Sequence, residues 1–312
     1  MKIYRHLNEF KKRDSVVTIG SFDGVHIGHR KILSSLQEVK QQHCGESVIL
    51  TFFPHPKMIL HPEDVDLKLI TTIDEKAELL EQLGVDNLII TPFTRDFSNL
   101  TAEEYIRHIL VEQIGTQRIV IGYDHRFGKN REGGLKELQK YSLQYNYEVE
   151  EIAEQDINEI AVSSTRVRSA LLNGDVKTAA TLLNYPFHLT GKVIKGDQIG
   201  RRLGFPTANI LVAETYKLIP ADGIYAVTVE INEQVYKGMG YIGHRPTING
   251  MSRNIEVNIF DFEGDLYGMN IRVHFYDFIR GDIRFNSLDE LREQLQRDKE
   301  ISVGLLRVIT KL

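Results

Sequence analysis

The sequence predicts a chain of two parts, an α/β domain built on a parallel sheet and then an antiparallel β-barrel with C-terminal helices. In the first half, short apolar runs alternate with amphipathic helical segments, which is typical of a doubly wound parallel sheet. In the second half, apolar residues recur with a period of two and without intervening helices, which indicates an antiparallel barrel. A length of 312 residues with 42% hydrophobic content is enough for two cores.

The α/β domain is expected to hold five strands separated by helices. The helix after the first strand carries its apolar residues on one face, and a later helix begins at a capping box formed by Thr101 and Glu104. Glycines just past the C-caps end two of the helices, at Gly84 and Gly115. The strands are expected at residues 16–19, 47–53, 87–90, 118–121 and, with a weaker pattern, 147–152.

The domain boundary is expected after residue 185, which gives a first domain of residues 1–185 and a second of residues 186–312. A helix at residues 176–183 ends at Asn184-Tyr185-Pro186, and no low-complexity linker follows. The strands of the second domain are expected at residues 223–230, 255–262 and 270–276.

Two helical segments are expected after the barrel strands. Ser287 and Glu290 predict a capping box at the start of the first segment, and residues 301–308 supply a further helical tail. The fold class is therefore α/β followed by β, with helices at the C-terminal end.

Composition excludes several classes of function. The net charge of −5 and the single cysteine, Cys44, argue against nucleic-acid binding, an intrachain disulfide and any multi-cysteine metal site. The N-terminus has no apolar leader region, and no apolar run approaches the roughly 18 residues of a membrane helix. We expect a cytoplasmic protein without a membrane partner, and we leave its oligomeric state open.

The first domain is organised around a loop that follows its first strand. Gly20, Gly24 and Gly28 allow the backbone to approach a ligand closely, and the helix that follows offers free N–H groups to phosphate. His26 and His29 are three residues apart, so both imidazoles can face one ligand if the helix has begun. The alternative is that His26 caps a turn and His29 is solvated. The concentration of these residues after a buried strand favours a nucleotide site.

Further polar segments collect at the ends of the expected strands. The second strand stops at Pro54-His55-Pro56, and the fourth leads into a glycine-bracketed loop at residues 122–129. Residues 163–168 place two hydroxyls and two arginines before a helix, which suits an anion site. Each segment taken alone is as well explained by a turn, a polar loop or an ordinary N-cap.

The second domain has its own candidate for phosphate binding, at residues 200–209. Its glycines and arginines suit a phosphate-binding loop, and the Thr207 hydroxyl and Asn209 amide are hard oxygen ligands that suit Mg²⁺. Glu256 lies on an expected strand as either a surface carboxylate or a general base. A barrel hairpin with exposed arginines is the alternative for the loop.

Two familiar nucleotide motifs are absent or rejected. A literal Gly-x-Gly-x-x-Gly occurs at residues 238–243, but His244-Arg245-Pro246 follows, so no helix can open there to meet a pyrophosphate. The sequence also lacks a P-loop, because no Gly-Lys pair precedes a serine or threonine.

The loop of the first domain resembles the His-x-Gly-His signature of the nucleotidyltransferase superfamily, in the form found in bifunctional riboflavin kinase/FMN adenylyltransferases, the bacterial FAD synthetase family. The resemblance implies a Rossmann-like nucleotidyltransferase domain in which His26 and His29 stabilise the transition state. It implies further ATP contacts from Gly20, Phe22, Asp23, Gly28, Ser164, Thr165 and Arg168. The flavin or nucleotide loops would hold Pro54, His55, Pro56, Asp124 and Phe127.

The second domain resembles riboflavin kinase in its Gly-Arg-x-Leu-Gly-x-Pro-Thr-Ala-Asn segment and in the order of its later motifs. The resemblance implies that Thr207 and Asn209 bind Mg²⁺ with ATP and that Glu256 is the catalytic base. It implies a kinase ATP site made of Gly200, Arg201, Gly204, Pro206, Thr207 and Asn209. The expected small molecules are ATP, riboflavin, FMN and FAD, with Mg²⁺ as the metal.

Four positions depart from the family pattern. His125 stands where an aromatic residue is expected, Tyr241 where Asn is expected and Asn258 where His is usual, and Gly281 interrupts the segment before the last helix. One alternative is therefore that only one half is active. Another is a non-catalytic, flavin-binding regulatory protein. An aminoacyl-tRNA synthetase is disfavoured, because the sequence has no Lys-Met-Ser-Lys-Ser segment.

Overall fold

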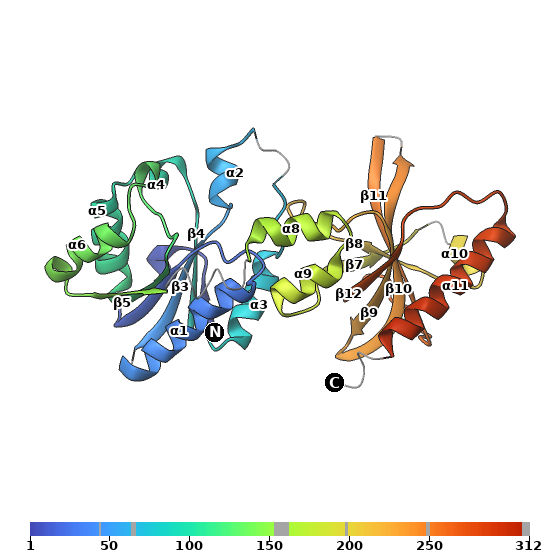
Figure 1. Ribbon diagram of the computed structural model, residues 1–312, viewed down its shortest axis with the longest axis horizontal. Helices are drawn as coiled ribbons and strands as arrows, with labels where there is room; N and C mark the ends of the chain where they lie inside the picture. The colour runs from blue at the N-terminus through green and yellow to red at the C-terminus, as the bar shows by residue number, and fades with distance from the viewer. Residues whose placement is uncertain (44, 64–66, 153–161, 197–198, 248–249, 308–312) are drawn as a thin grey trace. The chain divides into compact units, whose positions relative to one another are not determined.

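The computed structural model describes residues 1–43, 45–63, 67–152, 162–196, 199–247 and 250–307. The chain divides into two compact units, Met1–Ser164 and Thr165–Leu312, and each is described by itself (Figure 1). Helices α8 (Ser164–Leu172) and α9 (Val176–Leu183) belong almost entirely to the second unit. There α9 is joined to the barrel by an ion pair of 2.6 Å between Lys177 and Asp277. The boundary expected after residue 185 stays a prediction.

The first unit is built on a six-stranded parallel sheet, as the alternating pattern predicted. Its strand order is β1-β4-β3-β2-β5-β6, and every neighbouring pair is parallel. The first strand, β1, is an edge strand that the sequence analysis did not predict. The strands are β1 (Lys2–Tyr4), β2 (Ser15–Ile19), β3 (Glu46–Phe52), β4 (Asn87–Thr91), β5 (Thr116–Gly122) and β6 (Glu148–Ile152).

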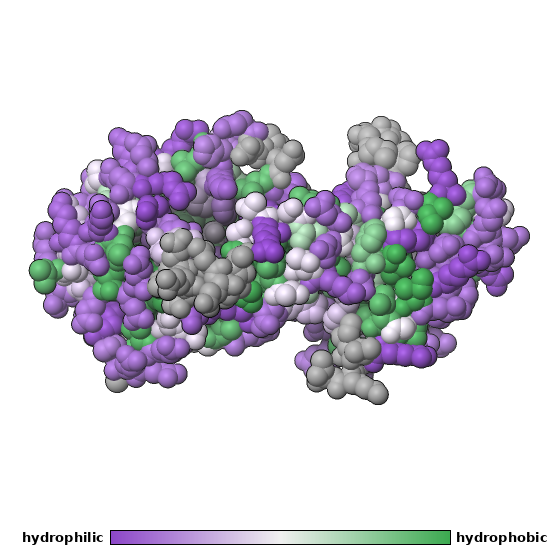
Figure 2. Space-filling view, viewed as in Figure 1, coloured by the Kyte–Doolittle hydropathy of each residue, from purple (hydrophilic) through white to green (hydrophobic). Residues whose placement is uncertain are grey.

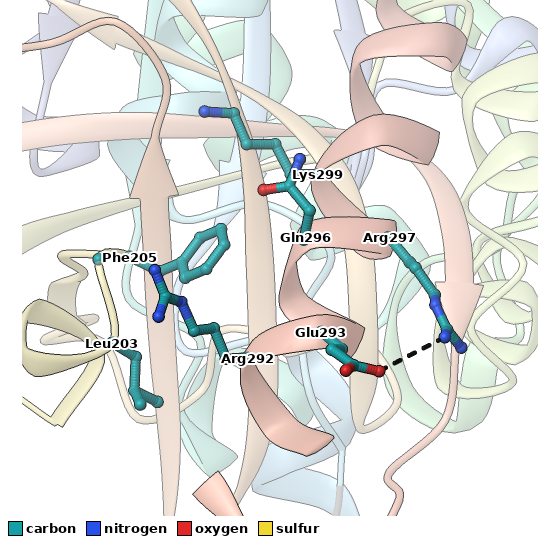
Figure 3. A pocket seen from close by; sticks show the side chains of 8 residues that line it. Leu203, Phe205, Arg292, Glu293, Gln296, Arg297 and Lys299 are labelled. Carbon is teal, nitrogen blue, oxygen red and sulfur yellow. Dashed lines mark ion pairs between the residues drawn. The ribbon is translucent and has the colours of Figure 1, made fainter. Parts of the chain in front are cut away.

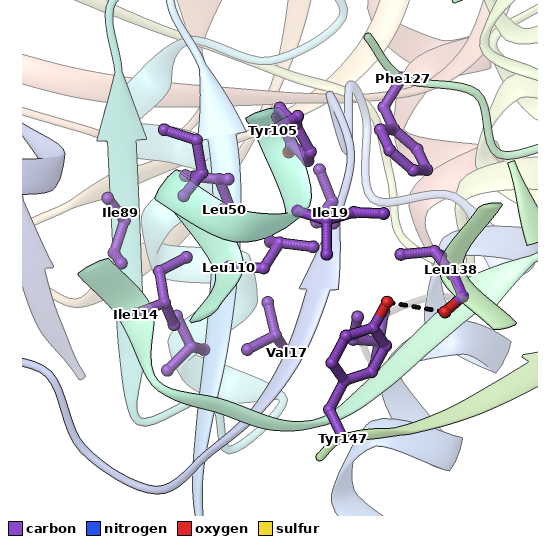
Figure 4. Packing of buried hydrophobic residues seen from close by; sticks show 14 of the residues in the cluster. Val17, Ile19, Leu50, Ile89, Tyr105, Leu110, Ile114, Phe127, Leu138 and Tyr147 are labelled. Atoms are coloured by element: carbon purple, nitrogen blue, oxygen red, sulfur yellow. Dashed lines mark hydrogen bonds between the residues drawn. The ribbon is translucent and has the colours of Figure 1, made fainter. Parts of the chain in front are cut away.

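Helices cover both faces of this sheet, so its central strands are buried on both sides. Alternate residues of β2 to β5 pack with helical residues in one core cluster, which includes Val17, Leu50, Leu110 and Leu138 (Figure 4). Helix α1 contacts β2, β3 and β5 with residues outside that cluster. The helical segments are η1 (Leu7–Glu9), α1 (Ile27–His43), α2 (Pro56–Leu60), α3 (Ile73–Gln82), α4 (Arg95–Ser98), α5 (Ala102–Glu104), η2 (Tyr105–Ile114), η3 (Lys129–Arg131) and α6 (Leu135–Tyr145).

Helix α5 and its continuation η2 confirm the predicted caps. The Thr101 hydroxyl accepts a hydrogen bond from the Glu104 N–H at 3.2 Å, and the Glu104 carboxylate accepts one from the Thr101 N–H at 2.9 Å. Helix α5 continues into η2 with π-helical geometry and ends at Gly115. Gly115 has φ +82°, and a Cβ there would lie 2.5 Å from the Arg13 carbonyl oxygen, so both conformation and space require glycine.

The second unit is a closed barrel with the strand order β10-β11-β8-β7-β12-β9 and antiparallel pairing throughout. Residues 238–243 lie within β10, where they pair with both β9 and β11. The structure thus confirms that the glycines of this segment form no dinucleotide-binding turn. The strands are β7 (His188–Ile194), β8 (Ala208–Leu211), β9 (Gly223–Ile231), β10 (Gln234–Thr247), β11 (Gly250–Ile259) and β12 (Asn270–Arg280).

One helix, α11 (Leu288–Leu306), packs against the barrel, and it departs from the prediction in two ways. It is continuous, so the helical tail expected at residues 301–308 is the end of this helix up to Leu306, and residues 308–312 lie outside the described part. Ser287 caps it by accepting from the Glu290 N–H at 3.1 Å, but the Glu290 carboxylate accepts from the Asn286 N–H. The reciprocal bond of a capping box is therefore not formed.

A buried ion pair ties α11 to the barrel. Asp298 is fully buried and accepts from Arg280 at 2.7 Å, and Gln294 donates to the same carboxylate at 2.9 Å. Since Arg280 is the last residue of β12, this pair anchors the segment that leads from the barrel to α11. Gly281 follows Arg280, and a Cβ at that position would meet no atom within 4 Å.

Candidate functional site

The first candidate site is the loop between β2 and α1, at the carboxyl end of the sheet. Asp23 is buried and accepts hydrogen bonds from the N–H groups of Ile70 at 2.9 Å and Thr71 at 3.2 Å. The Ser164 hydroxyl donates to the Asp23 carbonyl oxygen at 3.0 Å. The structure therefore brings together three segments that are far apart in the sequence, and two of the predicted site residues, Asp23 and Ser164, are in direct contact.

His26 and His29 form a stacked pair at the start of α1. Their ring centroids are 3.6 Å apart with an interplanar angle of 13°. The His29 N–H donates to His26 Nδ1 at 3.3 Å, so a neutral His26 carries its proton on Nε2. His26 thus caps the helix, as the alternative interpretation held, but His29 is not solvated. Gly28 leaves room for the pair, because a Cβ there would lie 3.0 Å from Val162 and 3.4 Å from the His26 ring.

The electrostatics keep His29 neutral. Burial, and then the nearby positive charges of His26 and Lys76, lower the pKa of His29 well below its usual value. The Phe22 ring lies against the pair, with its centroid 5.1 Å from that of His29. A neutral imidazole at His29, beside a helix N-terminus, can donate a hydrogen bond to a polyphosphate without adding a buried charge.

Several predicted residues of the first domain have local structural roles or lie elsewhere. His55 caps α2 by accepting from the Lys57 N–H at 3.2 Å, between Pro54, which follows a cis peptide bond, and Pro56. Asp124 is exposed on its loop. The remaining predicted ATP contacts, Thr165 and Arg168, lie on α8 in the second unit, so their approach to the histidine pair stays a prediction.

An aromatic cluster, which the sequence analysis missed, lies near the ends of β3 and β4. Phe52 contacts Phe93 and Phe97, with ring centroids 5.5 and 5.3 Å away. The Tyr105 ring lies between two others. Its centroid is 5.8 Å from that of Phe97 and 5.0 Å from that of the predicted loop residue Phe127. We name these five residues the aromatic cluster. The spacing of phenylalanines directly after two buried strands was the available signal.

Unsatisfied polar atoms lie beside the aromatic cluster. The Tyr105 hydroxyl, the Thr91 hydroxyl and His125 Nε2 are buried and have no hydrogen-bond partner among the described residues. Burial and two neighbouring arginines lower the pKa of His125 to about 4, so its ring is neutral, and it stacks on Phe127 at 5.8 Å. Buried polar atoms without partners are costly unless a ligand satisfies them.

The second candidate site lies on β8, β11 and the loop before β8, where three predicted residues converge. The Thr207 hydroxyl donates to the Glu256 carboxylate at 2.8 Å, and Asn209 is the register partner of Glu256 across β8 and β11. The Asn254 amide donates to the other carboxylate oxygen at 2.6 Å. Residues 49 positions apart in the sequence are thus in contact. Two oxygens of the same carboxylate are held in place by neighbouring side chains.

The loop before Thr207 packs closely on itself at its first glycine. A Cβ at Gly200 would lie 2.3 Å from the Phe205 carbonyl oxygen, and Gly204 has φ +86°. The Pro206 carbonyl accepts from the Asn258 amide at 2.7 Å, so the residue that departs from the family pattern holds this loop. Arg201 is exposed. Residues 199–202 form a short helix, α10, rather than a hairpin.

A pocket of about 580 Å³ lies between this loop and α11 (Figure 3). In Figure 3, Arg292 extends toward Phe205, while Arg297 pairs with Glu293 at 3.7 Å. Of the predicted kinase residues, Gly204 lines the pocket. Thr207, Asn209 and Glu256 are not among the residues that line this pocket.

Tyr241, the second departure, faces the Glu256 site. It is the register partner of Glu256 across β10 and β11, and its hydroxyl donates to Asp282 at 3.3 Å. Burial and the Asp282 carboxylate raise the pKa of Tyr241 to about 12. Tyr241 therefore links β10, beside Glu256, to the segment that follows Gly281.

Neither unit shows a His, Cys, Asp and Glu metal cluster among its described residues. Within the described part of the chain, none of the helices is long and apolar enough to cross a membrane. Hydrophilic side chains dominate the visible face (Figure 2).

The geometry defines the class of protein. A parallel sheet with a stacked His-x-Gly-His pair at its carboxyl edge, followed by a barrel with a Thr, Asn and Glu cluster, is a fused nucleotidyltransferase and kinase. Two family models match the chain in the same order, FAD synthetase over residues 8–166 and riboflavin kinase over residues 183–306.

Curated relatives have the same two-part arrangement. The chain is 36% identical over 303 residues to the bifunctional riboflavin kinase/FMN adenylyltransferase of Listeria monocytogenes, covering 96% of each chain. The Escherichia coli K12 protein of that name is 37% identical, with 96% of each chain covered. The chain belongs to the bifunctional riboflavin kinase/FMN adenylyltransferase family. A crystal structure described as a macrolide-efflux protein from Streptococcus pneumoniae has a TM-score of 0.86 at 33% identity, covering 96% of this chain and 97% of that one.

Proposed function

We propose that this protein makes flavin cofactors in two steps: it phosphorylates riboflavin to FMN with ATP, and it then adenylylates FMN to FAD with release of pyrophosphate. The observation that carries the proposal is the presence of both constellations in one chain, the stacked His26 and His29 pair and the Thr207, Asn209 and Glu256 cluster. The two matching family models and the bifunctional relatives support it.

In the kinase step, Glu256 takes the proton of the terminal ribityl hydroxyl. The resulting oxygen attacks the γ-phosphorus of ATP, the bond from that phosphorus to the bridging oxygen breaks, and ADP leaves. The Thr207 and Asn254 side chains hold the two carboxylate oxygens at 2.8 and 2.6 Å, which orients Glu256 for this transfer. Positioning and electrostatics supply most of the catalysis in phosphoryl transfer.

The donor set of the kinase site fits the Mg²⁺ that accompanies ATP. The Thr207 hydroxyl, the Asn209 amide and the Glu256 carboxylate present hard oxygen atoms, which Mg²⁺ prefers. Bound there, Mg²⁺ neutralises charge on the phosphates. We assign Thr207 and Asn209 to this role. The predicted loop residues Gly200, Arg201, Gly204 and Pro206 would contact the nucleotide.

In the adenylyltransferase step, an FMN phosphate oxygen attacks the α-phosphorus of a second ATP, and pyrophosphate leaves. His26 and the neutral His29 donate hydrogen bonds to the charge that develops on the phosphate oxygens. The buried Asp23 and its backbone donors hold the loop that presents both rings. Ser164, Thr165 and Arg168 would add contacts to the triphosphate. No covalent enzyme intermediate is required.

We place the flavin ring of FMN against the aromatic cluster. An isoalloxazine ring presents a flat apolar face and hydrogen-bonding edges, which match aromatic walls and buried polar atoms without partners. Asp124, Phe127 and His125 would then lie in the loop over the ring. The neutral imidazole of His125 replaces an aromatic ring at this position without adding a charge.

Replacing Tyr105 with Phe tests this placement. We expect the Michaelis constant for FMN to rise roughly 2- to 10-fold, because a net hydrogen bond contributes about 0.5–1.5 kcal/mol. Thermal stability should not fall, since the Tyr105 hydroxyl has no partner among the described residues. The measurement is the FMN dependence of FAD formation.

Tyr147→Phe is the matched control for this experiment. The Tyr147 hydroxyl lies in the same core and donates to the Leu138 carbonyl at 2.6 Å, so its removal should lower stability and leave the FMN dependence unchanged (Figure 4). If the Tyr105 variant and the native protein show the same FMN dependence, the flavin ring does not bind at the aromatic cluster.

A chromatographic assay tests the proposed function as a whole. Riboflavin, FMN and FAD are resolved over time after the protein is mixed with ATP and Mg²⁺, starting from riboflavin or from FMN. FAD from both starting points supports two active halves. Accumulation of FMN without FAD would mean that only the kinase half is active. Formation of FAD only from added FMN would mean that only the adenylyltransferase half is active. Flavin binding without ATP consumption would indicate a regulatory protein. Cytoplasmic localisation stays a prediction, supported by the single cysteine.

A further inference from the structure

Lys76 is a buried cation beside the loop of the adenylyltransferase site. It lies in the first turn of α3 and is only 3% exposed. Its ammonium donates to the Ser21 carbonyl oxygen at 2.6 Å, and it forms no ion pair with a carboxylate among the described residues. A buried ammonium normally has a carboxylate partner, because desolvation of the charge is costly. Because no carboxylate in the described part of the chain pairs with it directly, an anionic ligand beside the loop would stabilise its charge.

The loop that Lys76 holds has an unfavourable backbone conformation. Phe22 has φ +46° and Val25 has φ +41°, although neither is glycine and Val25 is β-branched. Such residues persist only where the surroundings hold them in place. Lys76 binds the loop at Ser21, before the first strained residue, and Thr71 binds it at Gly24, just before the second. The contacts from the segment before α3 and from α3 itself therefore determine where the loop presents the histidine pair.

The charge of Lys76 also acts on the histidines. Burial lowers the pKa of Lys76 to about 8, and the nearby Asp23 carboxylate opposes that shift. The positive charge in turn contributes to the lowered pKa of His29. Lys76 is therefore mostly protonated at neutral pH and about half protonated near pH 8, and an anion bound at the histidine pair would favour its charged form.

We propose that Lys76 is a positioning residue of the adenylyltransferase site: it fixes the strained loop through Ser21 and provides the buried positive charge that the polyphosphate of ATP neutralises. The inference rests on the proposed function of the first unit. Lys76 acts through the loop and through His29, and it needs no direct contact with the reacting phosphorus. The titratable groups that interact with it electrostatically are Asp23 from the loop and His29 from α1.

The test compares Lys76→Met, Lys76→Gln and Lys76→Arg in the full chain. We expect kcat/KM for ATP in FAD formation to fall about 10- to 100-fold in the Met variant, as for loss of a charged hydrogen bond. The Arg variant, which keeps the charge, should recover part of this loss. Riboflavin phosphorylation by the same molecules should not change. In the native protein, kcat/KM should fall above pH about 8, where Lys76 loses its proton, and the Gln variant should lack this decrease.

A binding measurement separates this proposal from the proposed function. Calorimetry with a non-hydrolysable ATP analogue at pH 8, in buffers of different ionisation enthalpy, should show the native protein taking up as much as about half a proton more than Lys76→Gln. If the native protein shows this difference in proton uptake but makes no FAD, the proposed adenylyltransferase function is wrong and the charge role of Lys76 is retained. Equal proton uptake would overturn the role of Lys76.

Leu80→Ala controls for a purely structural effect. Leu80 is fully buried on the same helix and does not bind the loop, so its truncation lowers stability by cavity formation. If Lys76→Met and Leu80→Ala reduce kcat/KM equally at matched losses of thermal stability, Lys76 has no positioning role. A Met variant with native kcat/KM would also contradict the proposal.

Discussion

Replacing Glu256 with Gln should lower riboflavin phosphorylation about 10²- to 10⁴-fold, the usual contribution of a general base. Gln keeps the size of the side chain and an oxygen that can accept from Thr207, but it cannot take the proton of the ribityl hydroxyl. FAD formation from added FMN should not change, because His26 and His29 belong to the other unit. The measurement is the initial rate of each step in one preparation.

Asn254→Ala is the control for Glu256. It removes the hydrogen bond of 2.6 Å to the carboxylate but leaves the carboxylate in place, so its effect on the kinase step should be much smaller. If Glu256→Gln retains more than about a tenth of the native kinase rate, the proton is accepted elsewhere, because general bases contribute at least about 10²-fold.

Replacing His29 with Ala should lower FAD formation from FMN about 10²- to 10³-fold, comparable to the loss of an oxyanion donor. The substitution removes the imidazole that stacks on His26 with ring centroids 3.6 Å apart. It also removes the contact of His29 with the Phe22 ring. Riboflavin phosphorylation should remain at the native rate. Single-turnover adenylylation of FMN measures the chemical step directly.

The pH dependence follows from the neutral state of His29. Because the pKa of His29 lies well below its usual value of 6.5, His29 is deprotonated from pH 6.5 upward, and its titration should not change FAD formation between pH 6.5 and 7.5. A rate that rises or falls through a His29-dependent pKa in this interval would contradict the assignment. His43→Ala, an exposed histidine at the end of the same helix, is the matched control and should have the native rate.

Local sequence patterns predicted the elements but not the contacts between them. Apolar runs marked the central strands because parallel strands are buried on both faces, and Thr101 with Glu104 marked a helix start because the cap is formed within four residues. The Ser287 cap was predicted only in part. Glu290 binds the Asn286 N–H instead, a choice between two adjacent donors that the sequence pattern does not distinguish.

In the candidate sites, too, the sequence predicted individual residues but not all of the contacts between them. The motif residues His26, His29, Thr207, Asn209 and Glu256 stand out by type and spacing, and the structure brings the last three together. Lys76 and Tyr105 were not predicted as site residues. In the sequence, Lys76 is one charged residue of an amphipathic segment, and Tyr105 is one aromatic residue in a largely apolar helical segment. Their roles depend on burial against partners more than 20 residues away.

The sequence alone determined the order of the two domains, the spacing of apolar residues in each, and the residue types that carry the chemistry. These properties depend on neighbours along the chain. The tertiary structure decided which residues meet. Strand order places Asp23 against Ile70 and Thr71, and barrel register places Glu256 opposite Asn209 and Tyr241. It also decided the charge states, since the pKa values of His29 and Lys76 depend on burial by distant segments.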